Sequence, residues 1–323
     1  IKENRINGKI IMFETAILFI IFKRKETALK VLEIIKQVKP KYLYIAADGW
    51  RDENEKIKCL ETREAVLKAI NFECEIKTLF RDKNLGCCDG VAGAIQWFFE
   101  NVEQGIILED DCLPEISFFD YCEKLLNYYK DNERIMHIAG DSPLDRKVGE
   151  ASYYFATIQH CWGWASWRRA WKYYDSTMKT ISFKDTKKTL KRRYKDFNIR
   201  DYWKNWFYRT GDINTWDYQW TYSIISKDGI CINPNLNMVS NIGFGTDSTH
   251  TSNSEDENAN RKTYPMDTKN IIHPSKIECD READFEIAIK RFGLIPFSLK
   301  HNLSREIKRI IRQIGDLFNM KNL

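Results

Sequence analysis

The chain lacks any long hydrophobic run. None of its apolar segments reaches the roughly 18–20 residues that a membrane-spanning helix needs. The longest candidate covers residues 10–22 and is interrupted by Glu14 and Thr15. The sequence also lacks an initial apolar segment followed by small residues at a cleavage site, the pattern of a secretory signal peptide. These absences argue against an integral membrane protein and lead us to expect a cytoplasmic one.

The cysteines lack the spacings of a disulfide framework or a zinc site. There are nine, an odd number, and none are spaced C-x-x-C. Cys112, Cys122 and Cys231 stand in apolar surroundings, as reduced thiols of a cytosolic protein commonly do. The net charge of +5 is too small to indicate nucleic acid, so we expect no such partner. The first residue is not Met, and we expect residues 1–11 to be an extension and Met12 the natural start.

One stretch of the chain is unusually acidic. Residues 105–108 are an apolar run that ends in Glu109, Asp110 and Asp111, and Pro114 follows shortly after. This pattern predicts a buried strand of a parallel sheet, and ligands of open α/β sheets bind at the carboxyl ends of such strands. A hard divalent cation shared with a diphosphate would neutralise the three carboxylates. The alternative, an acid that caps a helix near residue 118, explains one acid but not three.

The first half of the chain alternates predicted strands with predicted helices. The predicted strands are residues 16–22, 41–47, 75–80, 105–108 and 135–139. The predicted helices are residues 27–38, 61–70, 91–99 and 118–129. This rhythm is typical of βαβ units, and it predicts an α/β fold with a mostly parallel sheet and helices on both faces.

The second half is aromatic and basic. Tryptophans crowd residues 162–171, residues 184–209 suggest basic surface helices, and another helix is expected from residue 216. Residues 254–261 are polar, and we expect a mobile loop there. Residues 302–318 form a basic amphipathic pattern. This last helix either lies on an anionic membrane surface or packs on the rest of the protein, and both alternatives stay open.

Five motifs, in order along the chain, together resemble one family. They are residues 17–24 (Ile-Leu-Phe-Ile-Ile-Phe-Lys-Arg), 46–49 (Ala-Ala-Asp-Gly), 80–86 (Phe-Arg-Asp-Lys-Asn-Leu-Gly), the acidic cluster with 160–168 (His-Cys-Trp-Gly-Trp-Ala-Ser-Trp-Arg), and 241–245 (Asn-Ile-Gly-Phe-Gly). The chain resembles nucleotide-diphospho-sugar transferases of the GT-A type, in particular bacterial glycosyltransferase-like proteins related in fold to N-acetylglucosaminyltransferase I. Lys25 departs from the expected proline, which should alter the rigidity of the loop rather than the chemistry.

The resemblance implies a nucleotide-sugar site at the strand ends. Asp48 would accept a hydrogen bond from the base or ribose, although an Asp-Gly turn is the simpler interpretation of that dipeptide. Arg24 and Arg81 would contact ribose or diphosphate, and their alternative is a surface ion pair. Asn84 and Gly86 would let the backbone approach the nucleotide.

The resemblance also implies a bound Mn²⁺ or Mg²⁺. Asp111, the last acid of the cluster, would contact the metal directly. Asp110 would reach the ribose, or the metal through water, and Glu109 is assigned to nucleotide-sugar binding. His250 would close over the diphosphate and add an imidazole ligand, and otherwise it is a surface histidine.

The acceptor side is assigned to the aromatic half. Asp217 is the candidate general base of an inverting transfer, and its alternative role is a helix N-cap. Trp162, Trp164 and Trp216 are placed beside the acceptor, although tryptophans of this kind are commonly core residues.

We therefore expect a metal-dependent inverting hexosyl- or N-acetylhexosaminyltransferase that uses a nucleotide sugar, expected to be UDP-linked. Its acceptor would be a hydroxyl of a glycan, a lipid-linked molecule or a protein. One rival is a sugar-1-phosphate nucleotidyltransferase, but residues 23–27 lack the glycines of its phosphate loop. The other is a non-catalytic carbohydrate-binding protein, which should have lost the acidic cluster.

The expected organisation has four parts. Residues 1–11 are an extension, residues 12–142 form the nucleotide-sugar half, and residues 143–253 form the acceptor half of the same GT-A domain. Residues 254–323 comprise a loop and basic amphipathic helices. Such a protein would be cytoplasmic, with peripheral contact with the inner face of the membrane as an open alternative.

Overall fold

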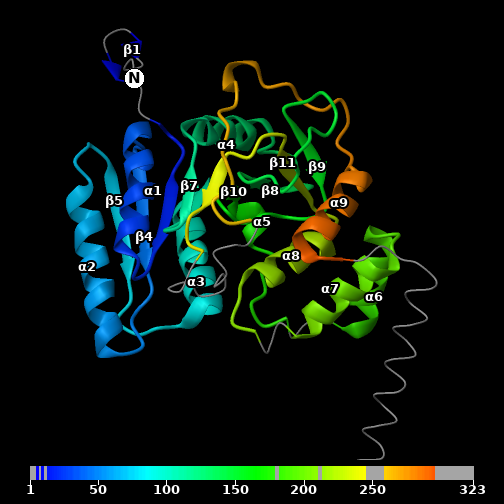
Figure 1. Ribbon diagram of the computed structural model, residues 1–323, viewed down its shortest axis with the longest axis horizontal. Helices are drawn as coiled ribbons and strands as arrows, with labels where there is room; N and C mark the ends of the chain where they lie inside the picture. The colour runs from blue at the N-terminus through cyan, green and yellow to red at the C-terminus, as the bar shows by residue number, and fades with distance from the viewer. Residues whose placement is uncertain are drawn as a thin grey trace, which may run out of the picture.

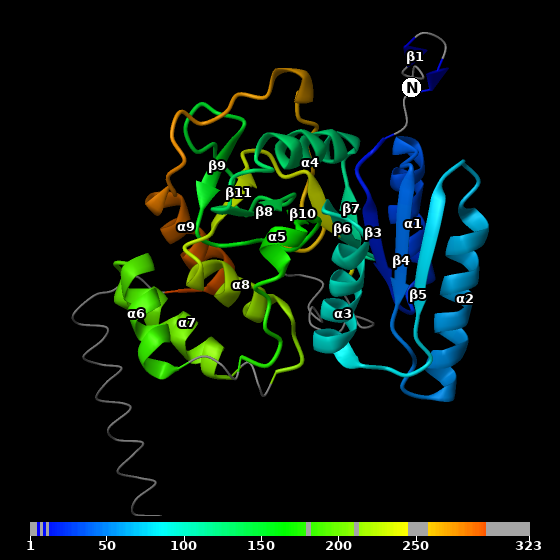
Figure 2. The ribbon, with the colours of Figure 1, turned by 180° about the vertical axis from the view of Figure 1, so that it is seen from behind.

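An eight-stranded sheet forms the centre of the molecule, and helices pack on both of its faces (Figures 1 and 2). The computed structural model describes residues 5–6, 9–10, 13–178, 182–209, 213–244 and 258–294. The strand order is β5-β4-β3-β6-β10-β8-β11-β9. The sheet is mixed and mostly parallel, so the α/β fold expected from the sequence is confirmed.

The strands are short. Those of the large sheet are β3 (Ile17–Ile21), β4 (Tyr42–Ala47), β5 (Glu75–Phe80), β6 (Gln104–Glu109), β8 (Ile135–Ala139), β9 (Tyr153–Ala156), β10 (Trp164–Trp167) and β11 (Ile230–Pro234). Two small antiparallel pairs accompany them: β1 (Arg5–Ile6) with β2 (Lys9–Ile10), and β7 (Cys112–Pro114) with β12 (Val239–Asn241).

The helices are distributed over both faces of the sheet. They are α1 (Lys25–Val38), α2 (Glu53–Ala69), α3 (Gly86–Asn101), α4 (Ile116–Tyr128), α5 (Arg168–Trp171), α6 (Phe183–Arg193), α7 (Phe197–Arg209), α8 (Asp217–Ser226) and α9 (Arg281–Phe292), with the 3-10 helix η2 (Thr268–Asn270). Side chains of α1, α2 and α4 enter one hydrophobic core, whereas those of α3, α5 and α8 enter another.

Alternation along β3 explains the two cores. Ile17, Phe19 and Ile21 pack into the core below α1 and α4, whereas Leu18 and Ile20 contact the core of α3. Successive side chains of a strand point to opposite faces, so a strand covered on both sides is apolar throughout. The apolar run from residue 16 to 22 predicts this double burial correctly.

Two helices, α2 and α3, begin more than a turn earlier than the hydrophobic pattern predicts. α2 starts at Glu53 rather than at residue 61, because the Asp52 side chain accepts a hydrogen bond of 2.8 Å from the backbone N–H of Glu55 and so caps the helix. α3 starts at Gly86 rather than at residue 91, and its caps come from distant parts of the chain. Both differences bring helix N-termini to the edge of the sheet where the acidic cluster lies.

The strand β10 is the largest departure from the predicted fold. It runs antiparallel to both of its neighbours, with Trp164 opposite Ile107 of β6 and opposite Ala139 of β8. The tryptophan-rich segment therefore supplies a central strand of the sheet as well as a site wall. All four residues of β10 are buried, which accounts for the aromatic and small side chains there.

A third hydrophobic core lies at the far end of the sheet. It joins residues of α6, α7, α8 and α9 to β9, with Trp203, Ile225 and Ile287 among its buried side chains. The basic surface helices predicted within residues 184–209 are confirmed as α6 and α7. No helix in the described ranges is long and apolar enough to cross a membrane. The amphipathic pattern at residues 302–318 and the first half of the predicted loop, residues 254–257, lie outside those ranges.

Candidate active site

The carboxyl ends of four parallel strands meet at one edge of the sheet. Ile21 of β3 pairs with Ala47 of β4, Ala47 pairs with Phe80 of β5, and Ile20 pairs with Glu109 of β6. The residues that follow these ends therefore share one edge, where open α/β sheets bind ligands. They include Arg24, Asp48, Arg81, Asp110 and Asp111.

A cavity of about 180 Å³ opens at this edge, and we call it the sheet-edge pocket. Its lining includes all seven residues assigned to nucleotide-sugar binding from the sequence: Arg24, Asp48, Arg81, Asn84, Gly86, Glu109 and Asp110. The fold thus brings together residues that span most of the first half of the chain. What each residue binds there remains a prediction.

Arg24 lies at the centre of the acidic cluster. Its Nη2 donates to Asp110 Oδ1 and, over 2.8 Å, to Asp111 Oδ2. The other oxygen of Asp110 accepts a hydrogen bond of 3.1 Å from the backbone N–H of Phe22, so both oxygens of this buried carboxylate have partners. Arg24 is therefore held by an internal ion pair. The sequence instead suggested a ligand of ribose or diphosphate, or an ion pair at the surface.

Gly243 closes the cluster from the second half of the chain. Its carbonyl accepts a hydrogen bond of 3.4 Å from Arg24 Nη1, and a Cβ at this position would lie 2.2 Å from Asp111 Oδ2. Only glycine permits so close an approach of backbone to a carboxylate. Residues 241–243 of the motif thus pack against the acids in space, although the chain separates them widely.

The cluster retains excess negative charge. Burial, together with Asp111 and Asp110, raises the pKa of Glu109 to about 8, and Arg24 opposes this shift. Burial likewise raises the pKa of Asp110 to about 6 against the favourable field of Arg24. Three carboxylates face one guanidinium, so ionising all of them without a further cation is unfavourable.

The donor set fits a hard divalent cation that a ligand helps to bind. Asp111 Oδ1 contacts only the Cys112 thiol, at 3.6 Å, and the Glu109 carboxylate has no hydrogen-bond partner within the described ranges. Oxygen atoms are the ligands that Mg²⁺ prefers, and one or two carboxylates completed by phosphate oxygens suffice. Among the described residues no group of three or more His, Cys, Asp or Glu side chains is arranged to hold a metal alone. His250 lies outside those residues.

The N-terminus of α3 is capped from two distant segments. Asp48 accepts hydrogen bonds from the backbone N–H groups of Leu85 and Gly86, at 2.9 and 3.1 Å, and Asn214 Oδ1 accepts one of 2.8 Å from Cys88. Asp48 is thus neither a simple turn aspartate nor a free carboxylate. The helix N-terminus that it positions faces the sheet-edge pocket and carries a partial positive charge, which favours a bound anion.

Asn84 and Gly86 shape the turn before this helix. Asn84 Nδ2 donates to the carbonyl of Gly49 over 2.8 Å, and its Oδ1 accepts from Gly86 N over 3.0 Å. Gly86 has φ of +81°, in the left-handed region that favours glycine. Both residues therefore line the pocket while fixing the backbone around it.

Basic side chains form the rim of the sheet-edge pocket. Arg81 Nη1 donates to the carbonyl of Gly90 on α3 over 3.2 Å. Lys23 and Arg51, which were not predicted as site residues, both contact the buried carboxylate of Glu55, at 2.8 and 2.5 Å. Hydrogen bonds from Arg51 lower the pKa of Glu55 to about 2, with Lys23 as a further partner. Glu55 thus orients two cations toward a site suited to a diphosphate.

A second cavity, of about 460 Å³, adjoins the first, and we call it the aromatic pocket. Arg24, Cys87 and Glu109 line both cavities and so form their common wall. The aromatic pocket also contains Asp111 and Asp217. Three acids from two halves of the chain therefore surround one space.

Asp217 is the first residue of α8, and Trp216 occupies the N-cap position. Its Oδ1 accepts a hydrogen bond from the Thr215 hydroxyl, which fixes the carboxylate toward the pocket. The N-cap position that the sequence suggested for Asp217 is therefore occupied by the preceding residue, Trp216. Its role as a base remains a prediction.

Two of the three predicted acceptor-side tryptophans line the aromatic pocket. Trp162 and Trp216 do so, and Arg291 lies 3.7 Å from the centroid of the Trp162 ring. Trp164 does not, and its assignment to the acceptor side is corrected. Its side chain is fully buried in β10 and stacks on Trp216 with centroids 5.6 Å apart, because β10 faces cores on both sides.

Trp206 and Tyr218 were not predicted as site residues. Their rings stack with centroids 4.7 Å apart and an interplanar angle of 9°, and both line the aromatic pocket. Trp206 belongs to α7, whose interleaved aromatic and basic residues indicated only a surface helix. The aromatic residues of α7, some of which face inward, were the feature of the sequence that could have indicated this wall of the pocket.

Comparisons with known proteins add little beyond the fold. No protein-family model and no curated protein sequence matches the chain. The mannosyltransferase PcManGT from Pyrobaculum calidifontis, solved with GDP-Man and Mn²⁺, is 12% identical with a TM-score of 0.38, over 67% of this chain and 70% of that one. Mouse xyloside xylosyltransferase 1 is 10% identical with a TM-score of 0.32, over 66% and 81%.

HddC from Yersinia pseudotuberculosis is 9% identical with a TM-score of 0.31, over 48% of this chain and 77% of that chain. Similarities this low carry no argument about activity or about individual residues. The GT-A-like architecture that the sequence motifs predict rests instead on the sheet itself and on the pocket at its carboxyl edge.

Proposed function

We propose that the chain is a metal-dependent glycosyltransferase that moves a sugar from a nucleotide diphosphate to an acceptor hydroxyl. The observation that carries this proposal is the common wall of the two pockets. A basic, sheet-edge cavity suited to a nucleotide diphosphate adjoins a larger cavity with aromatic walls and a further carboxylate. Glu109 and Arg24 lie between them, where the transferred sugar would sit.

The sheet-edge pocket would take the donor. Lys23, Arg51 and Arg81 supply positive charge for the diphosphate, and the N-terminus of α3 adds backbone N–H groups. Asp48 would accept the N3–H of uracil through lone pairs that its backbone partners leave open, which favours a UDP-sugar. A hexose or N-acetylhexosamine is the sugar that we propose.

Asp111 and Glu109, with diphosphate oxygens, would hold Mn²⁺ or Mg²⁺. A divalent ion there would stabilise the negative charge that develops on the departing nucleotide. Arg24 would remain bound to Asp110 and so keep the last turn of β3 in place. His250 is retained as a further proposed ligand.

Asp217 would act as the base from the acceptor side. Thr215 occupies its Oδ1, so Oδ2 is the atom that would take the proton of the acceptor hydroxyl. Attack from the face opposite the leaving group inverts the anomeric centre. The stacked pair of Trp206 and Tyr218 would offer a flat surface to a glycan, lipid-linked or protein-linked acceptor sugar, and Trp216, buried against Trp164, would support the wall of the pocket.

A donor-hydrolysis screen tests the proposal. Nucleotide sugars with UDP, GDP and other bases would be incubated with the protein and Mn²⁺, with and without a chelator, and free nucleotide measured. We expect turnover of a UDP-sugar that the chelator abolishes. Release of pyrophosphate from a nucleoside triphosphate and a sugar phosphate would instead identify a nucleotidyltransferase. Sugar binding without turnover of any donor would identify a carbohydrate-binding protein.

A further inference from the structure

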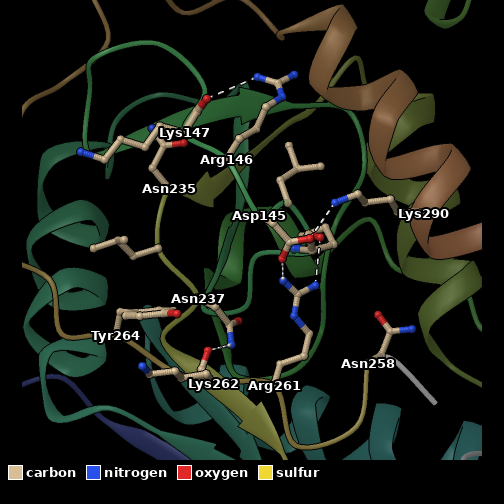
Figure 3. A pocket seen from close by; sticks show the side chains of 13 residues that line it. Asp145, Arg146, Lys147, Asn235, Asn237, Asn258, Arg261, Lys262, Tyr264 and Lys290 are labelled. Atoms are coloured by element: carbon tan, nitrogen blue, oxygen red, sulfur yellow. Dashed lines mark hydrogen bonds and ion pairs between the residues drawn. The ribbon is translucent and has the colours of Figure 1, made fainter. Parts of the chain in front are cut away.

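A third cavity, of about 520 Å³, lies apart from the sheet-edge pocket, and we call it the basic pocket (Figure 3). Its walls are the segment 143–147, the turn 235–237 between β11 and β12, the segment 261–264, and α9. Five cationic side chains line it, against a single carboxylate. The cations are Arg146, Lys147, Arg261, Lys262 and Lys290.

Two of these cations converge on the carboxylate of Asp145. Asp145 accepts a contact of 2.8 Å from Arg261 at one oxygen and one of 2.8 Å from Lys290 at the other. Figure 3 shows the two cations reaching Asp145 from different elements. Hydrogen bonding to Lys290 and the charge of Arg261 lower the pKa of Asp145. The electrostatic environment of Asp145 is therefore positive.

Positive charge remains after the internal ion pairs are formed. Arg146 contacts Glu286 over 2.7 Å, so a second carboxylate offsets part of the positive charge around the pocket. Lys147 and Lys262 have no carboxylate partner within the described ranges, and Lys262 lies 5.1 Å from the centroid of the Tyr264 ring. In Figure 3 Lys262 lies beside Tyr264 and Lys147 lies near Asn235, both across the pocket from Lys290.

The walls of the pocket are fixed by buried amides. Asn235 Oδ1 accepts from Val148 N over 2.8 Å, and its Nδ2 donates to the carbonyl of Ala151 over 2.8 Å. Asn237 Nδ2 donates to the carbonyl of Lys262 over 3.0 Å. These contacts join segments far apart in sequence, so the basic side chains extend from a rigid frame.

Two elements, β12 and α9, lead from the basic pocket to the aromatic pocket. The turn that includes Asn237 leads into β12, whose last residue, Asn241, lines the aromatic pocket. Four residues of extended chain span roughly 13 Å. On α9, Lys290 lines the basic pocket whereas the next residue, Arg291, lies over Trp162 of the aromatic pocket. The two cavities therefore lie about one short strand apart, a separation that an extended acceptor on the surface could span.

We propose that the basic pocket binds an anionic group, a phosphate or a carboxylate, carried by the acceptor at a distance from the hydroxyl that receives the sugar. Lys147 and Lys262 are the principal ligands, and the frame around Asp145 positions them. The assignment to the acceptor rests on the proposed transferase function, whereas the binding of an anion does not.

Lysine-resolved NMR tests the binding directly. Lysines labelled by ¹³C-methylation are titrated with inorganic phosphate and, separately, with glucuronate, and Lys147→Arg and Lys262→Arg assign their signals. We expect saturable shifts at these two lysines and none at Lys30 and Lys68, which are exposed on α1 and α2. The more effective anion identifies phosphate or carboxylate as the ligand group. Absence of saturable shifts at both lysines with both anions would overturn the inference.

Kinetics with matched acceptors test the assignment to the acceptor. In the double variant Lys147→Met with Lys262→Met we expect KM for an acidic acceptor to rise about tenfold, the effect of losing about 1.4 kcal/mol of binding. kcat, donor hydrolysis and KM for the neutral analogue should not change, and Lys30→Met with Lys68→Met is the control. Equal KM changes for acidic and neutral acceptors would refute the assignment. Anion binding without any sugar transfer would refute the proposed function and, with it, the acceptor assignment.

Discussion

Arg24 shows how a residue can satisfy a sequence pattern and yet have a different immediate partner. It was expected at the edge of the sheet as a ligand of ribose or diphosphate, and it lies there. Its guanidinium is held between Asp110 and Asp111, however, and the carbonyl of Gly243. A positive charge inside a cluster of three acids stabilises the cluster when no other cation is bound.

Removal of one acid from this cluster should separate binding from folding. We expect Asp111→Asn to abolish turnover and manganese-dependent UDP binding, because an amide is a much weaker ligand for a hard cation. Arg24 keeps Asp110 as its partner, so the circular dichroism spectrum should be unchanged. Calorimetric titration of UDP with Mn²⁺ measures the effect, and Asp131→Asn, at an exposed position, is the control. Unchanged UDP affinity and activity would exclude Asp111 as a metal ligand.

Asp217 should contribute to the chemical step and little to donor binding. Asp217→Asn keeps the hydrogen bond from Thr215 but removes the proton acceptor, so we expect turnover to fall by about 10²–10⁴. The affinity for UDP with Mn²⁺ should stay within the error of the titration. Steady-state kinetics and the anomeric configuration of the product provide the test. Near-normal turnover, or retention of configuration, would rule out this role.

Glu55 should give the protein an acid-sensitive component of stability. Its pKa is lowered to about 2, chiefly by hydrogen bonds from Arg51. A carboxyl group whose pKa is lowered in the folded protein stabilises the fold at pH values above its ordinary pKa near 4.5. This contribution to stability is lost as the pH falls toward 2. We expect Glu55→Gln to reduce the free energy of unfolding by about 1–2 kcal/mol at pH 7.

Urea unfolding at a series of pH values checks this prediction. The difference between wild type and Glu55→Gln should shrink below pH 4.5, since protonation removes the same charge. Glu53→Gln is the matched control, because the Glu53 side chain is 82% exposed and its loss should change little. A difference that stays constant down to pH 3 would contradict the lowered pKa.

At the level of elements, the strand β10 yields a prediction that distinguishes core from site. Trp164 is fully buried between β6 and β8, so Trp164→Ala should cost about 3–5 kcal/mol of stability. Trp162 is only partly buried at the pocket wall, and Trp162→Ala should cost about 1 kcal/mol while weakening acceptor use. Thermal and urea unfolding measure both. Equal destabilisation by the two variants would contradict this division.

Local pattern predicts the elements that bury continuous apolar runs. The strand expected at residues 135–139 is observed as the fully buried β8, and the strand expected at residues 16–22 is observed as β3. The carboxyl-end rule for parallel strands also predicts that Arg24, Asp48 and Arg81 share one edge of the sheet, and they do. These inferences succeed because strand alternation and strand polarity are properties of the local chain.

Elements that depend on distant partners were not predicted. β10 has four buried residues and no polar alternation, so nothing local distinguishes it from a site wall. Asn214 caps α3 from 126 positions away, and no local signal marks such a cap. The early start of α2 was different, because Asp52 followed three residues later by Glu55 is a recognisable capping pattern.

At the scale of the whole molecule, ligand binding at the sheet edge should stabilise the complete fold. The sheet-edge pocket is built from four strand ends and α3, and Asn214 of the second half also lines it. Saturating UDP with Mn²⁺, at about 100 times Kd, should add about 2.7 kcal/mol to the stability of the folded state. That corresponds to a Tm increase of several degrees for a chain of this size.

A thermal-shift experiment with two additions decides this point. The increase in Tm should disappear when a chelator is added, and it should be absent with UDP alone, because the acids repel the diphosphate without a metal. The Asp111→Asn variant should show no increase under any of these conditions. A chelator-resistant increase would show that the nucleotide binds without the ion.

The antiparallel placement of β10 also bears on how the polypeptide matures. During synthesis β6 leaves the ribosome before β10 does, so one edge of the growing sheet stays unpaired until residues 164–167 emerge. An unpaired apolar edge is a template for association with other chains. Because β6 and β8 are joined in the sheet only through β10, we expect that residues 13–142 do not fold as an autonomous unit. Gene fusions or circular permutations that separate β6 from β10 should therefore yield aggregates rather than a working half-enzyme.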